Sequence, residues 1–479
     1  MTTATPSASA RPLMNIARYD EGVYARVDAE RTDEDLQIEG ELPRELRGTF
    51  AQNSPNPRFT PPGATHWFDG DGMVHGVFIE NGRASYRNRY VQTAALRADL
   101  EAGQALRPGI MERFQPGDPS PDRDTANTDL VWHQGKLLAL WWLGGQPVHL
   151  RVPELDTVGV EDFGGTLKGG LAAHPKVDPR TGELIFFDYN PYRAPFLEVG
   201  VISPEGRCTS RQVIETPSPA LFHDIAITEH YTVLLDLPMV WDPERLARGQ
   251  RRVRFLRERP GRIGLLPRAG GEVRWFEVPP CYVYHTINAF EGVNRQGDPT
   301  VTLQACRIDD PIPSLPHSEE PEVPRLEFLR LDPYFYRWTL NLRTGEAQGE
   351  QLDDRRTEFP RMNNDRLGQP TRWSWHPRIA PAPTLLFDGC IAYDSESSSS
   401  AAHSYGPGRV GGETVFAPRP GATEENDGWV LVFVTDRRTE RSELQVLDAR
   451  DVAAGPIARV LLPARVPVGF HSHWAPMPA

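Results

Sequence analysis

Short stretches rich in β-branched and aromatic residues recur along the chain. They include ELIFFDYN (183–190), YTVLLDL (231–237), EVRWFEV (272–278), TVTLQACRI (300–308), YRWTLNL (336–342) and WVLVFVTD (429–436). Stretches of this length and composition are typical of β-strands. Turn sequences separate them, and DPRTGE (178–183) and NLRTGE (341–346) share one R-T-G-E turn. Helical periodicity is confined to pieces such as TAALRADLEAG (93–103), so the pattern predicts an all-β protein.

A β-propeller reconciles the many predicted strands with the lack of an obvious linker. Four-stranded blades arranged around an axis absorb a long chain as one unit. A long sandwich and two stacked barrels are the alternatives, and the sequence has no clean repeat of blade length. We expect residues 1–25 to form a flexible N-terminal arm and residues 26–479 to form one domain. In a propeller, the innermost strands of different blades converge on the axis, where residues far apart in the sequence can meet.

The charge pattern excludes several classes of partner. The chain has 479 residues and a formal net charge of −13, with no run of Lys or Arg. This argues against a nucleic-acid partner and against a polybasic membrane anchor. No apolar run approaches the roughly 18 residues that would span a bilayer, and the N-terminal MTTATPSASARPLMN lacks the apolar core of a secretory signal. We therefore expect a cytoplasmic protein.

Cysteine chemistry is not indicated. The four cysteines, at positions 208, 281, 306 and 390, have no C-x-x-C spacing. Neither a disulfide framework nor a thiolate metal site is expected. Any metal site must therefore be made from histidines and carboxylates.

Four of the 13 histidines have settings that suit an inward-facing metal ligand. Each follows small or apolar residues and stands at the start of a predicted strand or within one: His174 in GGLAAHPKVDPRTGEL, His223 in ALFHDIAITEHYTVLL, His285 in PPCYVYHTINAFEG and His471 in GFHSHW. Imidazole is the commonest protein metal ligand, but most histidines are ordinary polar rings. Structural or surface roles are expected for His66, His75, His133, His149, His230, His317, His376 and His403.

Three further residues are ambiguous from their local sequence. Alternation along a strand puts His471 and His473 on one face, so both imidazoles could bind one metal, or one could bind while the other is incidental. Glu358 in TEFPRMN could pair with Arg361, and Glu413 in GPGRVGGETVFAP could be an ordinary strand-start residue. The residues alone favour surface roles for both carboxylates.

A series of motifs resembles the carotenoid cleavage oxygenase family, which includes bacterial apocarotenoid and lignostilbene oxygenases and the vertebrate retinoid isomerase. In chain order the motifs are LPRELRGTFAQNSPNP (42–57), FDGDGMVHGV, NRYVQT, NTDLVWHQGKLLAL, AHPKVDPRTGEL, FHDIAIT, YHTINAFE, RWTLNL, TEFPR, YGPGRVGGETVFAPRPGATEENDGW and GFHSHW. Each fragment alone is weakly specific. The ordered set spans nearly the whole chain and is highly specific.

The resemblance implies a seven-bladed β-propeller with a cap of loops and short helices over an axial metal site. It further implies one non-heme Fe(II) per chain, held by His174, His223, His285 and His471. Glu358 in the EFPR motif and Glu413 in the GE-x-VF-x-P motif would hydrogen-bond to ring N–H groups of these ligands and tune the iron. The family pattern F-H-x-x-W selects His471 and leaves no coordination position for His473, which is interpreted as structural or cleft-lining.

The reaction that the resemblance implies is dioxygenation. O2 adds across a conjugated C=C bond, and two carbonyl (aldehyde) products leave. Four neutral imidazoles leave the iron its full 2+ charge and, in six-coordination, two open positions. No protein acid or base is required, so no catalytic residue is expected beyond the metal ligands. The implied partners are O2 and a small hydrophobic conjugated substrate, while peripheral membrane contact and the oligomeric state are left open.

One part of the family pattern is absent. In most relatives the strand resembling GKLLALW continues into a Glu before a Gly-containing turn, whereas this chain reads LLALWWLGGQPVHL. Counting forward from LLALW puts Trp142 in that place, and counting back from the Gly-Gly pair puts Leu143 there. A third outer carboxylate is therefore predicted to be missing, so one imidazole would lack a charged partner. Trp142 and Leu143 are expected to line the substrate cleft.

The same stretch bears on the substrate. Stilbene-cleaving relatives tend to carry a Lys just before that Glu, where this chain offers only Trp141 and Trp142. An indole suits a polyene tunnel, so an apocarotenoid is favoured over a stilbene or other phenylpropanoid alkene. The remaining hypotheses are an isomerase or hydrolase on the same scaffold, and a non-catalytic ligand-binding propeller with a degenerate iron site.

Overall fold

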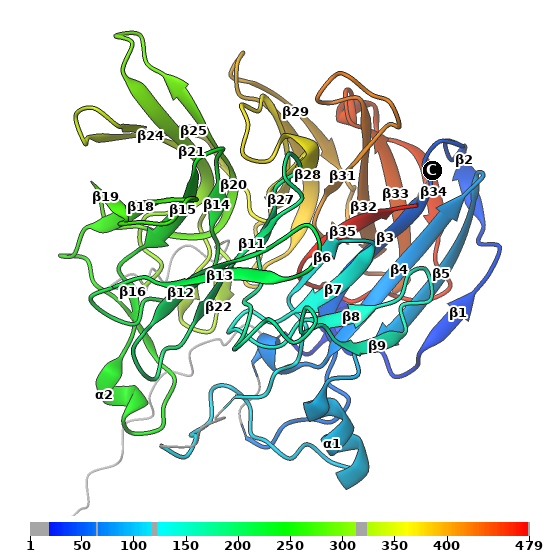
Figure 1. Cartoon of the computed structure of the whole chain (residues 1–479). Coiled ribbons are helices and arrows are strands. Elements are labelled where there is room, and N and C mark those ends of the chain that lie inside the picture. Colours follow the sequence, from blue (N-terminus) through cyan, green and yellow to red (C-terminus); the bar gives the residue numbers. More distant parts are fainter. Residues whose placement is uncertain (1–18, 64–65, 117–121, 313–322, 478–479) are drawn as a thin grey trace, which may run out of the picture.

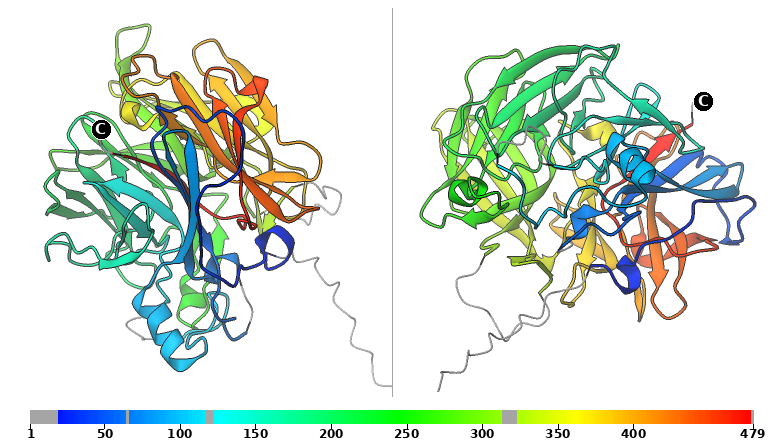
Figure 2. Two further views of the ribbon diagram at one scale, coloured as in Figure 1. Left: turned by 90° about the vertical axis from the view of Figure 1, so that its right-hand side faces the viewer. Right: turned by 90° about the horizontal axis from the view of Figure 1, so that it is seen from below.

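Seven blades surround one axis. The computed structural model describes residues 19–63, 66–116, 122–312 and 323–477. Five separate sheets of four or five strands form one blade each, and a ten-stranded sheet forms two. Seen from below, the blades follow one another around a common centre in the order of the sequence (Figure 2). The predicted all-β, seven-bladed propeller is confirmed.

Blades 2 to 5 each begin at their innermost strand and run outward along the chain. Blade 2 consists of β6 (Asp129–His133), β7 (Lys136–Leu140), β8 (Val148–Leu150) and β9 (Thr157–Val160). Blade 3 consists of β10 (Lys176–Val177), β11 (Leu184–Tyr189), β12 (Leu197–Ile202) and β13 (Cys208–Val213). Blade 4 consists of β14 (Ala226–Ile227), β15 (Tyr231–Asp236), β18 (Gly261–Pro267) and β19 (Arg274–Val278). Blade 5 consists of β20 (Tyr282–Val293), β21 (Pro299–Ile308), β24 (Tyr334–Asn341) and β25 (Ala347–Arg356).

Blades 6 and 7 share the ten-stranded sheet. Blade 6 consists of β26 (Arg361–Met362), β27 (Trp373–Ile379), β28 (Phe387–Asp394) and β29 (Ser399–Ser404). Blade 7 consists of β31 (Val415–Pro418), β32 (Gly428–Asp436), β33 (Arg441–Asp448) and β34 (Pro456–Leu461). Between them, β30 (Arg409–Gly411) pairs with both β28 and β32 and joins the two blades.

Blade 1 joins the two ends of the chain. From the outside inward its strands are β1 (Arg31–Asp33), β5 (Arg83–Tyr90), β4 (Gly72–Glu80), β3 (Gly48–Pro55) and β35 (Ser472–Pro476). Antiparallel pairing of β3 with β35 puts Phe50 opposite Trp474. A further N-terminal strand, β2 (Ile38–Gly40), pairs with β34 of blade 7. The last strand of the chain therefore closes the propeller at its axis.

The strand and helix predictions agree with the observed elements. The six stretches predicted as strands form β11, β15, β19, β21, β24 and β32. The predicted helix forms α1 (Ala94–Ala102), which begins where the Thr93 side chain accepts the N–H of Leu96 and ends at Gly103, whose φ is +69°. Strand β32 is buried along nearly its whole length, because apolar residues on both of its faces pack into the core.

Short elements and loops cover one side of the propeller. Both α1 and α2 (Pro243–Leu246) lie on this side (Figure 1). It also carries a 3-10 helix (Trp67–Asp69) and two small hairpins, β16 (Met239–Trp241) with β17 (Val253–Phe255) and β22 (Arg325–Leu326) with β23 (Leu329–Arg330). These elements form the predicted cap.

The packed structure begins before the boundary predicted at residue 26. Residues 1–18, most of the predicted arm, lie outside the described residues, as does His317. Within residues 19–25, Val23 and Tyr24 are buried, and the Tyr19 hydroxyl donates to the carbonyl oxygen of Arg325 at 2.8 Å. This short segment therefore packs against the cap.

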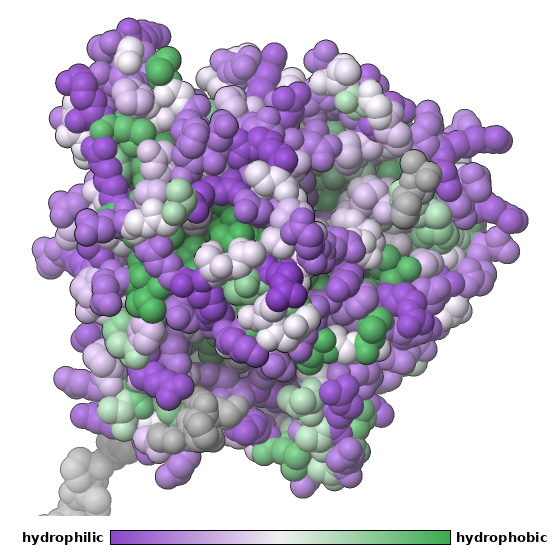
Figure 3. Space-filling view, viewed as in Figure 1, coloured by the Kyte–Doolittle hydropathy of each residue, from purple (hydrophilic) through white to green (hydrophobic). Residues whose placement is uncertain are grey.

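The visible surface is mostly hydrophilic. Hydrophobic side chains gather in small groups on the face shown in Figure 3. Two exposed apolar side chains, Leu100 and Leu106, lie in and just after α1. Among the described residues, no helix is both long and apolar enough to cross a membrane.

Candidate metal centre

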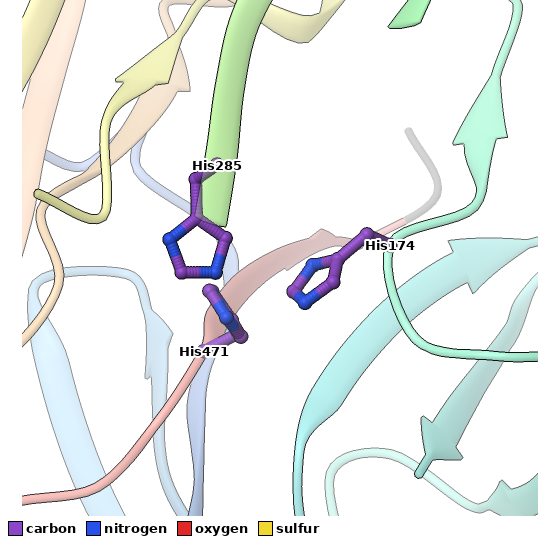
Figure 4. A group of neighbouring side chains, drawn as sticks. All are labelled: His174, His285 and His471. Carbon is purple, nitrogen blue, oxygen red and sulfur yellow. The ribbon is translucent and has the colours of Figure 1, made fainter. Parts of the chain in front are cut away.

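Four histidines meet at the axis from four different blades. His174 and His223 lie just before the innermost strands β10 and β14, His285 lies within β20, and His471 directly precedes β35. Figure 4 shows three of them, His174, His285 and His471, turned toward one another. All four side chains are buried. The structure thus brings together the four histidines that the sequence singled out.

The spacing of the rings suits a single metal ion. Ring centroids lie 4.4 Å apart for His174 and His471, 4.6 Å for His285 and His471, and 5.0 Å for His223 and His285. The Nε2 atoms of His223 and His285 are 3.3 Å apart. Two nitrogen ligands at right angles on one metal, each bonded at about 2.1 Å, are about 3 Å apart. One nitrogen from each of His174, His285 and His471 lies within 4.8 Å of the others.

Three of the rings are held neutral. Burial, followed by the charge of neighbouring histidines, lowers the pKa of His174, His223 and His471 well below its usual value. A neutral imidazole offers a lone pair to a metal. The Nε2 atom of His174 is buried and has no hydrogen-bond partner among the described residues. A buried, unpaired nitrogen surrounded by other rings fits a metal cofactor.

Two carboxylates hold two of the rings. Glu358, just before β26, accepts a hydrogen bond from Nδ1 of His285 at 2.5 Å. Glu413, just before β31, accepts one from Nδ1 of His471 at 2.9 Å. Each glutamate is 2% exposed, so the surface roles suggested by local sequence are wrong. The structure puts both where the family resemblance implied.

These hydrogen bonds have electrostatic consequences. Burial lowers the pKa of His285, but the charge and hydrogen bond of Glu358 outweigh it and leave the pKa raised. Burial raises the pKa of Glu413, and the nearby Arg361 guanidinium offsets this only in part. Arg361 lies 2.8 Å from Glu413 and so balances its buried charge.

The other two rings have different surroundings. The backbone N–H of His174 donates to Oδ2 of Asp129 at 3.0 Å, and Nδ1 of the same histidine lies 3.7 Å from that oxygen. No carboxylate contacts the ring of His223 among the described residues, and the ring packs edge-on against Tyr284 at 5.1 Å. Local sequence did not identify Asp129. Its only signal was an Asp at the start of the predicted strand in NTDLVWH, and nothing in the sequence showed that it reaches the axis.

An apolar cavity borders three of the four rings. Its polar lining includes His223, His285, His471, Glu358, Thr128 and Tyr284. Its apolar lining consists of Trp67, Phe68, Trp142, Leu326, Leu331, Phe359, Leu385 and Phe470. Trp142 therefore lines this cavity. Leu143 is buried in the core and does not border this cavity in the described part of the chain.

A second, more polar cavity borders the same centre. Its lining includes His174, Asp129, Lys176, Arg361 and His473. His473 lies on β35, and burial lowers its pKa to about 3. It stands apart from the described group of potential metal-binding histidines.

The whole chain aligns with known proteins. The family model described as retinal pigment epithelial membrane protein matches residues 24–476. A carotenoid cleavage oxygenase from Mycobacterium tuberculosis is 34% identical, with 99% of this chain and 100% of the relative covered. A carotenoid 9,10(9',10')-cleavage dioxygenase from Crocus sativus is also 34% identical, with 91% of this chain and 85% of the relative covered.

Solved structures share the fold. The lignostilbene dioxygenase of Pseudomonas brassicacearum superposes with a TM-score of 0.85 at 32% identity, with 98% of this chain and 100% of that chain covered. A cobalt-substituted form of the Synechocystis apocarotenoid oxygenase superposes with a TM-score of 0.82 at 28% identity, with 95% and 98% covered. Both likenesses extend over nearly the whole propeller.

Proposed function

This chain belongs to the carotenoid cleavage oxygenase family and is an oxygenase that cleaves C=C bonds, and from this premise we propose that it is an Fe(II) dioxygenase of apocarotenoids. One ion per chain would be held by His174, His223, His285 and His471. The observation that carries the proposal is a set of four buried imidazoles, two of which donate a ring N–H to a carboxylate, and three of which line an apolar cavity.

The donor set supports iron. Imidazole suits iron, zinc, copper and nickel, and zinc has no redox chemistry with which to activate O2. When bound, Fe(II) would supply O2 activation. The overall reaction is balanced by substrate and O2 alone: one C=C bond is broken, and each of its carbons takes one oxygen atom to become a carbonyl group. No further oxidant or reductant is needed.

The protein's own residues would orient and protect the reacting bond. Glu358 and Glu413 accept the Nδ1–H groups of His285 and His471, which leaves each Nε2 to face the centre. Phe68, Trp142 and Phe470 contact one another through Phe68 and would surround the reacting bond with an apolar surface. The one carboxylate in the described cavity lining is Glu358, and it accepts a hydrogen bond from His285. We therefore assign no residue as a general acid or base.

The lining supports an apocarotenoid over a stilbene. A phenolate would need a cation near its oxygen, and no Lys or Arg lines the described part of this cavity. Stilbene-cleaving relatives tend to carry a Lys in the LLALWW stretch, where this chain offers only Trp141 and Trp142. An elongated apolar polyene needs only the aromatic and aliphatic surface that this cavity offers. The cytoplasmic location expected from the sequence stays a prediction.

Product analysis tests this proposal. Iron-loaded protein is incubated in air with an apocarotenal and, separately, with a hydroxystilbene, and the products are separated by chromatography. We expect iron-dependent cleavage of the apocarotenal into two carbonyl products, at a higher kcat/KM than for the stilbene. Preferential cleavage of the stilbene would reverse the substrate class. A product with the mass of the substrate would indicate an isomerase, and cleavage of neither compound would favour a ligand-binding propeller with a degenerate site.

A further inference from the structure

Each of the seven innermost strands has a histidine or carboxylate near its start. In each blade a histidine or carboxylate lies within three residues of the first residue of the innermost strand. Blades 3, 4, 5 and 1 contribute the histidines His174, His223, His285 and His471. Blades 6 and 7 contribute Glu358 and Glu413, and blade 2 contributes Asp129, the first residue of β6. Asp129 thus lies near the start of the innermost strand of its blade, as the two glutamates do in theirs.

We propose that Asp129 is the third carboxylate of the metal centre and a positioning residue for His174. This inference rests on the proposed metal-binding role of the four histidines. The third carboxylate of the family pattern is absent at Trp142. Asp129 would take its role from the innermost strand, β6, of the same blade. The ring that it serves is His174, whereas His223 has no carboxylate contact among the described residues.

The contacts of Asp129 with His174 support this role. Its Oδ2 accepts the backbone N–H of His174 at 3.0 Å and lies 3.7 Å from Nδ1 of the ring. The second distance is too long for a hydrogen bond, so the carboxylate acts on the neutral ring only as a nearby negative charge. Its Oδ1 accepts the N–H of Leu130 at 2.8 Å, which fixes the carboxylate. Asp129 is only 3% exposed, so water and dissolved salt screen its charge only weakly.

The backbone of His174 needs such support. Its φ is +68°, a left-handed conformation that residues with a Cβ rarely adopt. A strained residue at a functional site persists only when its surroundings hold it in place. The hydrogen bond from the His174 N–H to Asp129 does this from the neighbouring blade. The same contact therefore fixes the backbone that carries the ring and puts a negative charge beside the ring.

Arg361 links the new carboxylate to one already described. Its guanidinium lies 3.9 Å from Asp129 and 2.8 Å from Glu413, and it also donates to the carbonyl oxygen of Ser472. Burying two carboxylates close together without a cation would be costly. Arg361 thus lets both Asp129 and Glu413 carry charge near the four rings.

Cobalt(II) titration of the metal-free full-length protein tests the proposal without requiring turnover. Asp129→Asn keeps an oxygen that can accept the His174 N–H but removes the charge. We expect cobalt affinity to fall about tenfold or more, as is typical for loss of an outer carboxylate, with a change in the visible absorption bands of the bound ion. Glu358→Gln provides the benchmark. Asp236→Asn is the matched control, because Asp236 is equally buried and ion-paired, with Arg259 and Arg262, but lies away from the centre.

The outcomes separate this proposal from the proposed function. Circular dichroism first establishes that each variant is folded. Wild-type affinity and an unchanged spectrum in Asp129→Asn would overturn the role of Asp129, whatever the enzyme cleaves. An equal loss of affinity in Asp129→Asn and Asp236→Asn would also overturn it, because the effect would then be general destabilisation. A protein that binds cobalt in the expected order but cleaves no alkene would contradict the proposed function and leave the role of Asp129 intact.

Discussion

The two halves of the metal centre hold the same kind of ligand in different ways. In blades 5 and 1, His285 and His471 each donate Nδ1–H to a buried glutamate. In blades 3 and 4, His174 is held through its backbone, and His223 through ring packing against Tyr284. The first arrangement fixes the tautomer and the orientation of the ring together. The second fixes orientation alone, so the two halves should respond differently to substitution, pH and loss of metal.

The largest expected effect is the loss of a ligand from the carboxylate-supported half. His285→Ala removes one ligand and leaves Glu358 buried without its partner. We expect less than about a tenth of an equivalent of iron after anaerobic reconstitution, measured by elemental analysis. His473→Ala is the control and should keep a full equivalent, because none of the described ring contacts that link the four histidines involves His473. Full iron occupancy in His285→Ala would refute its role as a ligand.

The next effect is on affinity. Glu358→Gln keeps the shape of the side chain but weakens the hydrogen bond that orients His285. We expect metal to bind roughly 10 to 100-fold more weakly in an equilibrium titration. Glu291→Gln is the matched control, because Glu291 accepts from the exposed His230 instead. Equal affinities for the two variants would mean that Glu358 does not support His285 as a metal ligand.

A third test uses pH. Burial depresses the pKa of His223 in the folded, metal-free protein. Below about pH 6.5 the unfolded chain therefore takes up a proton that the folded protein does not. The free energy of unfolding consequently falls as the pH drops. The raised pKa of His285 acts in the opposite direction, because it stabilises the folded state at low pH and this contribution is lost as the pH rises. The free energy of unfolding of the metal-free protein is measured with urea between about pH 5 and pH 7. In His223→Gln its decrease toward low pH should be smaller by up to about 1.4 kcal/mol per pH unit. In His285→Gln the same decrease should be larger. A change in the same direction in both variants would contradict the contrast between the two halves.

The smallest effect is expected from removing one hydroxyl. Tyr284 packs against His223 through its ring, and its buried hydroxyl has no partner among the described residues. Tyr284→Phe should therefore leave metal affinity unchanged and alter the free energy of unfolding by less than about 1 kcal/mol. Tyr282→Phe, which loses a hydrogen bond to the carbonyl oxygen of Leu221, should cost about 1 kcal/mol in the same assay. A loss of metal affinity in Tyr284→Phe would show that its hydroxyl, and not ring packing, holds His223.

The sequence predicts one half of this centre better than the other. Histidines at strand starts are visible in local patterns, and the family motifs point to Glu358 and Glu413. Asp129 stands in an equally visible motif but was missed, because its role depends on which neighbouring segment its carboxylate meets. The positive φ of His174 likewise follows from packing between blades and has no local signal, such as a Gly. Residues 19–25 were assigned to a flexible arm for the same reason, since their apolar partners lie in the cap.

Cavity walls were predictable only in part. Counting along LLALWWLGG leaves Trp142 and Leu143 as equivalent candidates, because a turn can shift the register by one residue. Only the tertiary structure shows that Trp142 borders the described cavity and that Leu143 lies in the core. The strands and the helix, whose signals are local, were predicted closely.

The central claim is that O2 is split between two carbonyl products at an iron held by four histidines. The most direct measurement is the reaction of iron-loaded protein with an apocarotenal under ¹⁸O2, with mass spectrometry of both products at short reaction times. The account predicts one ¹⁸O atom in each new carbonyl group and no reaction in His285→Ala. Two products without the label, or labelled cleavage that persists in His285→Ala, would contradict it.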